Sequence, residues 1–86
     1  MRKPRILIAD DDTMVRIGLK TVINWEENGF VLVGEAANGL EAMQLVQEKK
    51  PDIVITDIKM PGMDGVTLAR RLRQRDGQLV IIFITA

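Results

Sequence analysis

Four short apolar runs recur along the chain, and the intervals between them are long enough to form helices. The runs predict β-strands over residues 5–9, 30–34, 52–56 and 79–85. Residues 53–55 and 80–84 are continuously apolar rather than alternating, which is typical of strands that helices cover on both faces of a parallel sheet. The pattern therefore predicts the element order βαβαβαβ.

The first interval predicts an amphipathic helix. Its apolar side chains occur at spacings that place them on one helical face, which consists of Val15, Leu19, Val22 and Ile23. We expect the pair Asn28-Gly29 to end this helix, because asparagine followed by glycine favours a turn.

Two more helices are expected in the later intervals. The second begins with a capping-box-like pair, Asn38 and Glu41, and ends with lysines ahead of Pro51. The third is expected from about Asp64 to Arg75. Its apolar face consists of Val66, Ala69 and Leu72.

The alternation of strands and helices predicts an open α/β fold. Right-handed crossovers and short connections favour a doubly wound parallel sheet, in which ligands bind beyond the carboxyl ends of the strands. We expect the flavodoxin-like strand order 2-1-3-4, in which the first and third strands are neighbours. Candidate functional residues should therefore lie where these two strands end.

The composition is typical of one small globular domain. The chain has 86 residues, of which 47% are hydrophobic, and it carries 12 basic and 12 acidic side chains. Its longest apolar run, residues 79–84, is far shorter than the roughly 20 residues that span a bilayer. We therefore expect no membrane segment, no secretion signal and a cytoplasmic location.

Two absent residue types narrow the chemistry. The chain has no cysteine and no histidine, which excludes disulfides, thiol nucleophiles, thiolate zinc sites and a histidine base. Any chemistry must therefore use carboxylates, hydroxyls or lysines. The net charge of zero argues against nucleic-acid binding by the whole chain, and we interpret a local arginine cluster as a solvated helix face. This cluster consists of Arg70, Arg71, Arg73 and Arg75.

Acidic side chains follow the two neighbouring strands. The first strand ends in Asp10-Asp11-Asp12 and the third ends in Asp57. Asp10, Asp11 and Asp57 are expected to converge within a few ångströms, where their charges repel one another unless a hard divalent cation binds them. We expect magnesium at this site, and we interpret Asp12 as a cap of the following helix.

A magnesium site of this kind favours phosphoryl chemistry. Magnesium is usually held by one or two carboxylates together with water and phosphate oxygens. Asp57 is then a candidate nucleophile, because a carboxylate needs no base to activate it. The hydroxyl of Thr85, at the end of the fourth strand, is a candidate for stabilising the transferred oxygens.

Four motifs occur together in one order: residues 6–12, 52–57, 60–65 and 83–86. In this combination they resemble the receiver domain of two-component response regulators, and the resemblance covers the entire chain. It implies that a histidine kinase transfers a phosphoryl group to Asp57 and that Asp10 and Asp11 help to bind magnesium. It also implies that the backbone carbonyl of Lys59 is a metal ligand and that Thr85 is the switch hydroxyl.

The resemblance also bears on domain extent and partners. Similar receivers continue through a fourth helix, a fifth strand that carries a lysine, and a fifth helix, so residues 1–86 are expected to be the N-terminal portion of a receiver domain. Residues 21–30 resemble receivers that precede an AraC-type DNA-binding domain, which would make DNA a partner only through a separate output domain. Without its fifth neighbour, the strand Leu79 to Ala86 is expected to self-associate through its edge.

Two other interpretations remain open at this point. A phosphohydrolase of the haloacid-dehalogenase kind would use Asp10, Asp12 and Thr85, but it leaves Asp57 unexplained and needs a lysine and an acidic pair that have no candidates in the right order. Phosphate on Asp10 rather than Asp57 would favour it. A flavin-binding module would place phosphate beside three carboxylates that repel it, and a colourless purified protein would dismiss it.

Overall fold

A four-stranded parallel sheet organises the computed structural model, which describes residues 2–84. The strands lie in the order β2-β1-β3-β4, so the predicted flavodoxin-like doubly wound arrangement is confirmed. The strands are β1 (Arg5–Ala9), β2 (Val31–Ala36), β3 (Ile53–Asp57) and β4 (Val80–Ile84). The helices are α1 (Thr13–Val22), α2 (Gly39–Lys49) and α3 (Gly65–Arg75).

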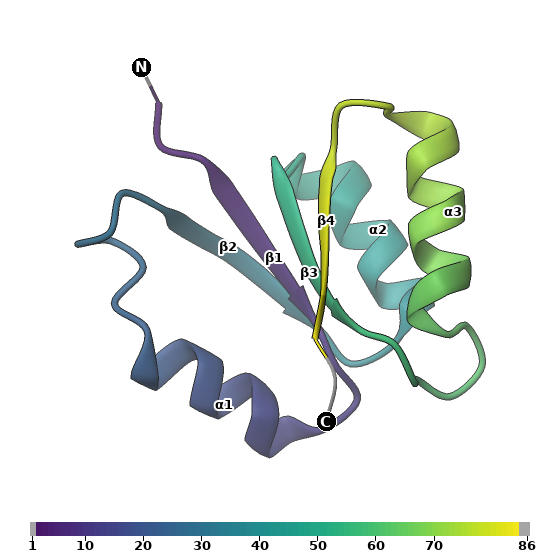
Figure 1. Ribbon diagram of the computed structural model, residues 1–86, viewed down its shortest axis with the longest axis horizontal. Helices are drawn as coiled ribbons and strands as arrows, with labels where there is room; N and C mark the ends of the chain where they lie inside the picture. The colour runs from purple at the N-terminus through teal and green to yellow at the C-terminus, as the bar shows by residue number, and fades with distance from the viewer. Residues whose placement is uncertain (1, 85–86) are drawn as a thin grey trace.

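The helices divide between the two faces of the sheet, with α2 and α3 on one face and α1 on the other (Figure 1). Because successive strand residues point to opposite faces, Leu7 and Ala9 of β1 face α2 and α3, while Ile6 and Ile8 face α1. The cluster beneath α2 and α3 is the larger one: Leu7, Ala9, Ala36, Ala42, Val54, Met60, Leu68, Leu72 and Leu79. The buried cluster on the α1 face consists of Ile6, Ile8 and Ile55.

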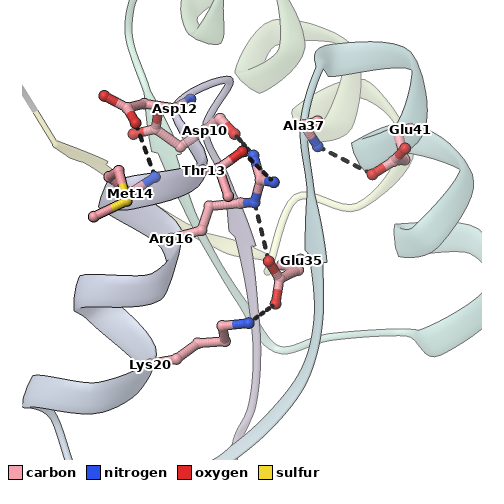
Figure 2. Close-up of polar contacts among 9 residues, drawn as sticks. All are labelled: Asp10, Asp12, Thr13, Met14, Arg16, Lys20, Glu35, Ala37 and Glu41. Atoms are coloured by element: carbon pink, nitrogen blue, oxygen red, sulfur yellow. Dashed lines mark hydrogen bonds and ion pairs between the residues drawn. The ribbon is translucent and has the colours of Figure 1, made fainter.

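Side-chain caps begin all three helices. The predicted pair at α2 is confirmed, because Asn38 accepts a hydrogen bond from the Glu41 N–H at 2.8 Å. The Glu41 carboxylate in turn accepts a hydrogen bond from the Ala37 N–H at 3.0 Å (Figure 2). Asp12 caps α1 by accepting from the Met14 N–H at 2.9 Å, and Asp64 caps α3. These bonds satisfy N–H groups that have no partner within the helix.

The first helix is shorter than its sequence pattern predicted. It ends at Val22 rather than at Asn28-Gly29, and Val22 is 84% exposed, so the expected apolar face does not include it. The chain leaves the helix because Trp25 folds back. Its indole N–H donates to the Leu19 carbonyl at 3.1 Å, and its ring meets Phe30 edge to face.

One expectation about the buried face of α3 is also corrected. Val66 is 45% exposed, and the buried face of α3 instead consists of Gly65, Leu68 and Leu72. The helix is rotated this way because Gly65 packs directly against the backbone of Asp57.

The exposure of β4 agrees with the apolar strand edge expected here, because three of its side chains are nearly half exposed: Val80, Ile82 and Phe83. Within residues 2–84, β4 lies at the edge of the sheet and pairs only with β3. The unpaired strand edge that the sequence predicts is therefore present along residues 80–84. None of the helices among these residues has the length and apolarity that a bilayer crossing needs.

Candidate functional site

Three carboxylates meet at the carboxyl end of the sheet, as the strand order predicted. Asp10 follows β1 directly, Asp11 comes next, and Asp57 is the last residue of β3. One oxygen from each side chain lies within 4.8 Å of the other two. Asp10 is buried, Asp57 is half-buried and Asp11 is exposed, so the cluster opens towards solvent.

Asp10 is the carboxylate that is most tightly built into the fold. It is 3% exposed, its backbone N–H donates to the Ala36 carbonyl at 3.0 Å, and its carboxylate accepts the Asp12 N–H at 2.9 Å. Burial is the largest cause that raises the pKa of Asp10, and the nearby carboxylates of Asp57, Asp11 and Asp12 raise this pKa further. The Asp12 N–H acts in the opposite direction. The site therefore concentrates negative charge where water is partly excluded.

The loop after β3 fixes the backbone of Asp57. The Gly65 N–H donates to the Ile58 carbonyl at 2.8 Å, and a Cβ atom on Gly65 would lie 2.0 Å from the carbonyl oxygen of Asp57. Only glycine allows this approach. The Lys59 N–H points to the Asp57 carboxylate at 3.4 Å, so Lys59 lies beside the acidic cluster. Thr85, the predicted switch residue, lies outside the described residues.

Sequence reasoning missed a set of polar contacts on the α1 face. Figure 2 shows Arg16 and Lys20 of α1 reaching Glu35 of β2, at 3.0 Å and 2.5 Å, and Arg16 also donates to the Asp10 carbonyl at 2.6 Å. The hydrogen bond from Lys20 is the largest cause that lowers the pKa of Glu35 below its ordinary value of 4.5, although partial burial opposes it. An arginine one helical turn after the Asp12 cap was the available signal, but its partner on β2 depends on strand pairing.

The donor set of the acidic cluster fits a hard divalent cation. Asp10, Asp11 and Asp57 offer only oxygen atoms, and magnesium prefers oxygen ligands. Asp12 is not part of this cluster, because its carboxylate caps α1 as expected. The exposed side of the cluster also leaves room for phosphate oxygens, which can complete the coordination shell of a magnesium ion.

A comparison with known families decides the family of the chain. The family model of the response regulator receiver domain matches residues 6–86. The chain belongs to this family. The strand order and the acidic cluster are therefore features of a receiver domain.

Similar proteins and structures agree with this family. The uncharacterized transcriptional regulatory protein YesN of Bacillus subtilis is 47% identical over 68 residues, which are 79% of this receiver chain and 18% of YesN. Sporulation initiation phosphotransferase F of the same organism is 41% identical over 86 residues, which are 100% of this chain and 67% of that protein. The receiver chain thus spans less than a fifth of one relative and about two thirds of the other.

Among solved structures, the REC domain of AraT, a response regulator from Geobacillus stearothermophilus, superimposes with a TM-score of 0.90 at 36% sequence identity. The match covers 95% of this receiver chain and 64% of the AraT chain. Because the identity is well above that of fold likeness alone, the match supports both the receiver fold and the receiver family.

Proposed function

We propose that this receiver domain accepts a phosphoryl group on Asp57 from a histidine kinase, with magnesium bound beside the acceptor. The observation that carries the proposal is the convergence of Asp10, Asp11 and Asp57, whose oxygens lie within 4.8 Å at the carboxyl end of the sheet. In a receiver-family chain without histidine, this cluster supplies both an acceptor and a metal-binding environment.

The proposed reaction transfers one phosphoryl group between two side chains. A carboxylate oxygen of Asp57 attacks the phosphorus of a phosphohistidine on the kinase, a P–O bond forms, and the P–N bond breaks. The electron pair of the broken bond remains on the imidazole nitrogen, and the product is an acyl phosphate. Asp57 needs no base for this step because its ionised carboxylate already carries the attacking electron pair.

Magnesium would be held by Asp10, Asp11, Asp57 and the backbone carbonyl of Lys59. When bound, it supplies positive charge that offsets the carboxylates and the oxygens of the arriving phosphoryl group. The chain itself positions the acceptor, because the close approach of Gly65 fixes the carbonyl of Asp57. In this proposal the hydroxyl of Thr85 donates a hydrogen bond to the transferred group.

This chemistry makes the domain a signalling switch rather than an enzyme that acts on a separate substrate. The domain would catalyse phosphotransfer only onto its own Asp57. The haloacid-dehalogenase alternative would instead place phosphate on Asp10, whose carboxylate is buried and already accepts the Asp12 N–H. The receiver family and the more open position of Asp57 both favour Asp57 as the acceptor.

The partners follow from the same proposal. The kinase is the phosphodonor, and DNA is a partner only through an output domain outside this chain, with the whole protein acting in the cytoplasm. The name of YesN, a transcriptional regulatory protein, supports a transcriptional output. Because the matched residues are 18% of YesN and 64% of the AraT REC-domain chain, we propose that residues 1–86 are the N-terminal portion of a receiver domain in a longer protein.

We also propose that the 86-residue chain self-associates through the edge of β4. Val80, Ile82 and Phe83 are each more than 40% exposed, and β4 pairs with only one strand among the described residues. An exposed apolar edge of this kind recruits another strand. Light scattering should give a mass above that of one chain, and a soluble, cooperatively unfolding monomer would contradict this proposal.

Phosphorylation tests the central proposal. Acetyl phosphate and magnesium are added to the protein that carries this chain, and intact mass is measured for the parent, Asp57→Asn and Asp12→Asn. Asp12→Asn is the matched control, because asparagine caps helices as well as aspartate does and Asp12 lies outside the cluster. We expect a phosphoryl adduct on the parent and on Asp12→Asn only. An adduct that persists in Asp57→Asn, or that maps to Asp10, contradicts the proposal.

A further inference from the structure

Arg16 connects the loop after β1 to the neighbouring strand β2. Its guanidinium donates to three acceptors: the Asp10 carbonyl at 2.6 Å, the Glu35 carboxylate at 3.0 Å and the Thr13 hydroxyl at 3.3 Å (Figure 2). The side chain is 13% exposed, so these bonds are shielded from most competing water. The planar fork of arginine can reach several acceptors at once, which a lysine ammonium on a flexible stem cannot reproduce in the same geometry.

These contacts hold the backbone of Asp10 from both sides. Its N–H donates to the Ala36 carbonyl at 3.0 Å, while its carbonyl accepts from Arg16, which is itself held by Glu35. Glu35 and Ala36 are consecutive residues of β2 and pair in register with Ile8 and Ala9. Asp10 is therefore attached to one short stretch of β2, directly through its N–H and indirectly through Arg16.

The position of the Asp10 carbonyl determines where two carboxylates point. This carbonyl belongs to the peptide between Asp10 and Asp11, so rotation of that peptide moves Asp11 relative to Asp10. Asp10 also accepts the Asp12 N–H at 2.9 Å, which connects the peptide to the start of α1. A contact that fixes the carbonyl thus fixes the whole acidic turn from Asp10 to Asp12.

We infer that Arg16, held by Glu35, is a positioning residue for the magnesium site. It contacts the carbonyl of Asp10 rather than any carboxylate of the cluster, and so acts through the backbone of the ligand-bearing loop. This inference rests on the magnesium site of the proposed function. Partners that orient metal ligands affect affinity strongly, and their loss typically weakens binding about 10- to 100-fold.

Lys20 offers a matched control on the same helix. It is also a cation of α1 and pairs with the same Glu35 carboxylate at 2.5 Å. None of its hydrogen bonds among the described residues reaches Asp10 or Thr13, whereas Arg16 bonds both. Loss of Lys20 therefore removes a positive charge and an ion pair with Glu35 but leaves the Asp10 carbonyl held.

The experiment measures magnesium affinity by calorimetric titration of the 86-residue chain and its variants. We expect Arg16→Gln and Arg16→Lys each to weaken binding by about tenfold, and Lys20→Gln to change it by less than about twofold. Arg16→Lys is decisive where Arg16→Gln fails to fold, because it keeps the charge and loses the three-acceptor geometry. Thermal unfolding by circular dichroism identifies the folded variants.

A second readout needs no metal. Without magnesium, the Asp12 amide should exchange its hydrogen faster in Arg16→Lys than in the parent, because the Asp10 carboxylate that accepts this N–H is no longer fixed. The exchange rate in Lys20→Gln should match the parent.

Four outcomes decide the inference. Weaker binding in the Arg16 variants alone, with faster exchange at Asp12, supports it. Arg16 variants that bind magnesium as the parent does, or Lys20→Gln that binds as weakly as Arg16→Lys, overturn this inference while leaving the proposed function intact. A parent chain that binds no magnesium overturns the metal site of the proposed function and the inference with it.

Discussion

The two faces of the sheet are held by different kinds of contact. Beneath α2 and α3, fully buried apolar side chains such as Leu68 and Leu72 pack against Leu7 and Val54. On the other face, none of the 10 residues of α1 is buried. Polar contacts attach that helix to β2 and to the loop after β1, from Arg16 to Glu35 and Asp10 and from Lys20 to Glu35. Its Leu19 side chain packs, partly buried, against the small apolar cluster of this face.

The contrast indicates a division between stability and function. Apolar burial on the α2 and α3 face contributes most of the free energy of folding, since it scales with the area removed from water. The loop that carries Asp10 and Asp11 continues into α1, on the face with the smaller buried cluster. Segments with few buried contacts open at lower cost, so α1 should open more readily than α2 and α3.

The largest effect expected from this comparison is in the core. Leu68→Ala should lower the free energy of unfolding by about 3 kcal/mol, because Leu68 is fully buried and its truncation leaves a cavity. Leu19→Ala, on the partly buried face of α1, should cost only about 1 kcal/mol. Urea unfolding of both variants measures the difference, and equal losses would contradict the division between the faces.

The next largest effect is expected at Gly65, where α3 packs against the backbone of Asp57. Gly65→Ala should destabilise the fold by about 2 kcal/mol and weaken magnesium binding, because its Cβ would overlap the Asp57 carbonyl oxygen at 2.0 Å. Gly77→Ala is the matched control, since its Cβ meets nothing within 4 Å, and it should be neutral or slightly stabilising. Chemical denaturation and magnesium titration measure both effects. A Gly65→Ala chain that matches the parent in both would show that the close approach does not position Asp57.

A substitution in the acidic cluster should stabilise the fold, in contrast to the substitutions of Leu68 and Gly65 above. A raised pKa means that ionised Asp10 destabilises the fold, so the stability that Asp10 contributes is present below its ordinary pKa of 3.8 and is lost as pH rises through the folded-state pKa. Asp10→Asn should therefore stabilise the magnesium-free chain at pH 7 by about 1 kcal/mol, which raises its melting temperature by about 4–8 °C. A lower melting temperature for Asp10→Asn would show that the ionised carboxylate of Asp10 does not destabilise the fold.

The smallest effect concerns the ion pairs of α1. The pKa of Glu35 is lowered, so its contribution to stability is present above the ordinary value of 4.5 and is lost as pH falls through the folded-state pKa. Glu35→Gln should cost less than about 1 kcal/mol at pH 7, because the Glu35 side chain is 34% exposed and solvent screens its charge. The difference in melting temperature between the parent and the variant should shrink as the pH falls below 4.5. A difference that stays constant at low pH would show that the lowered pKa of Glu35 is not its cause.

Hydrophobic patterning and capping residues predicted the order of the elements, because each depends on neighbours in the sequence. The starts of α2 and α3 follow from Asn38 and Asp64, and the sheet order follows from general rules of handedness and connection. The end of α1 did not follow, since it depends on a contact between Trp25 and the carbonyl of Leu19. The exposure of Val66 depends on how closely Gly65 approaches Asp57.

The candidate site also contains residues that could be predicted from the sequence and contacts that could not. Asp10, Asp11 and Asp57 could be brought together from the sequence, because parallel strands end at the same edge of the sheet. The contact of Arg16 with Glu35 could not, because it requires the register of β1 against β2, which shifts between Ile6 and Leu7. Residues that orient the loop are therefore harder to predict than the residues that end the strands.

The central claim is that Asp10, Asp11 and Asp57 form one magnesium site around the phosphoacceptor. Its most direct test is a magnesium titration of the 86-residue chain and of Asp57→Ala, followed by amide resonances in the NMR spectrum. The parent should show saturable shifts concentrated at residues 10–12 and 57–59, and Asp57→Ala should lose them while remaining folded. A parent whose resonances do not respond, or an Asp57→Ala chain that titrates with the same midpoint, would contradict the claim.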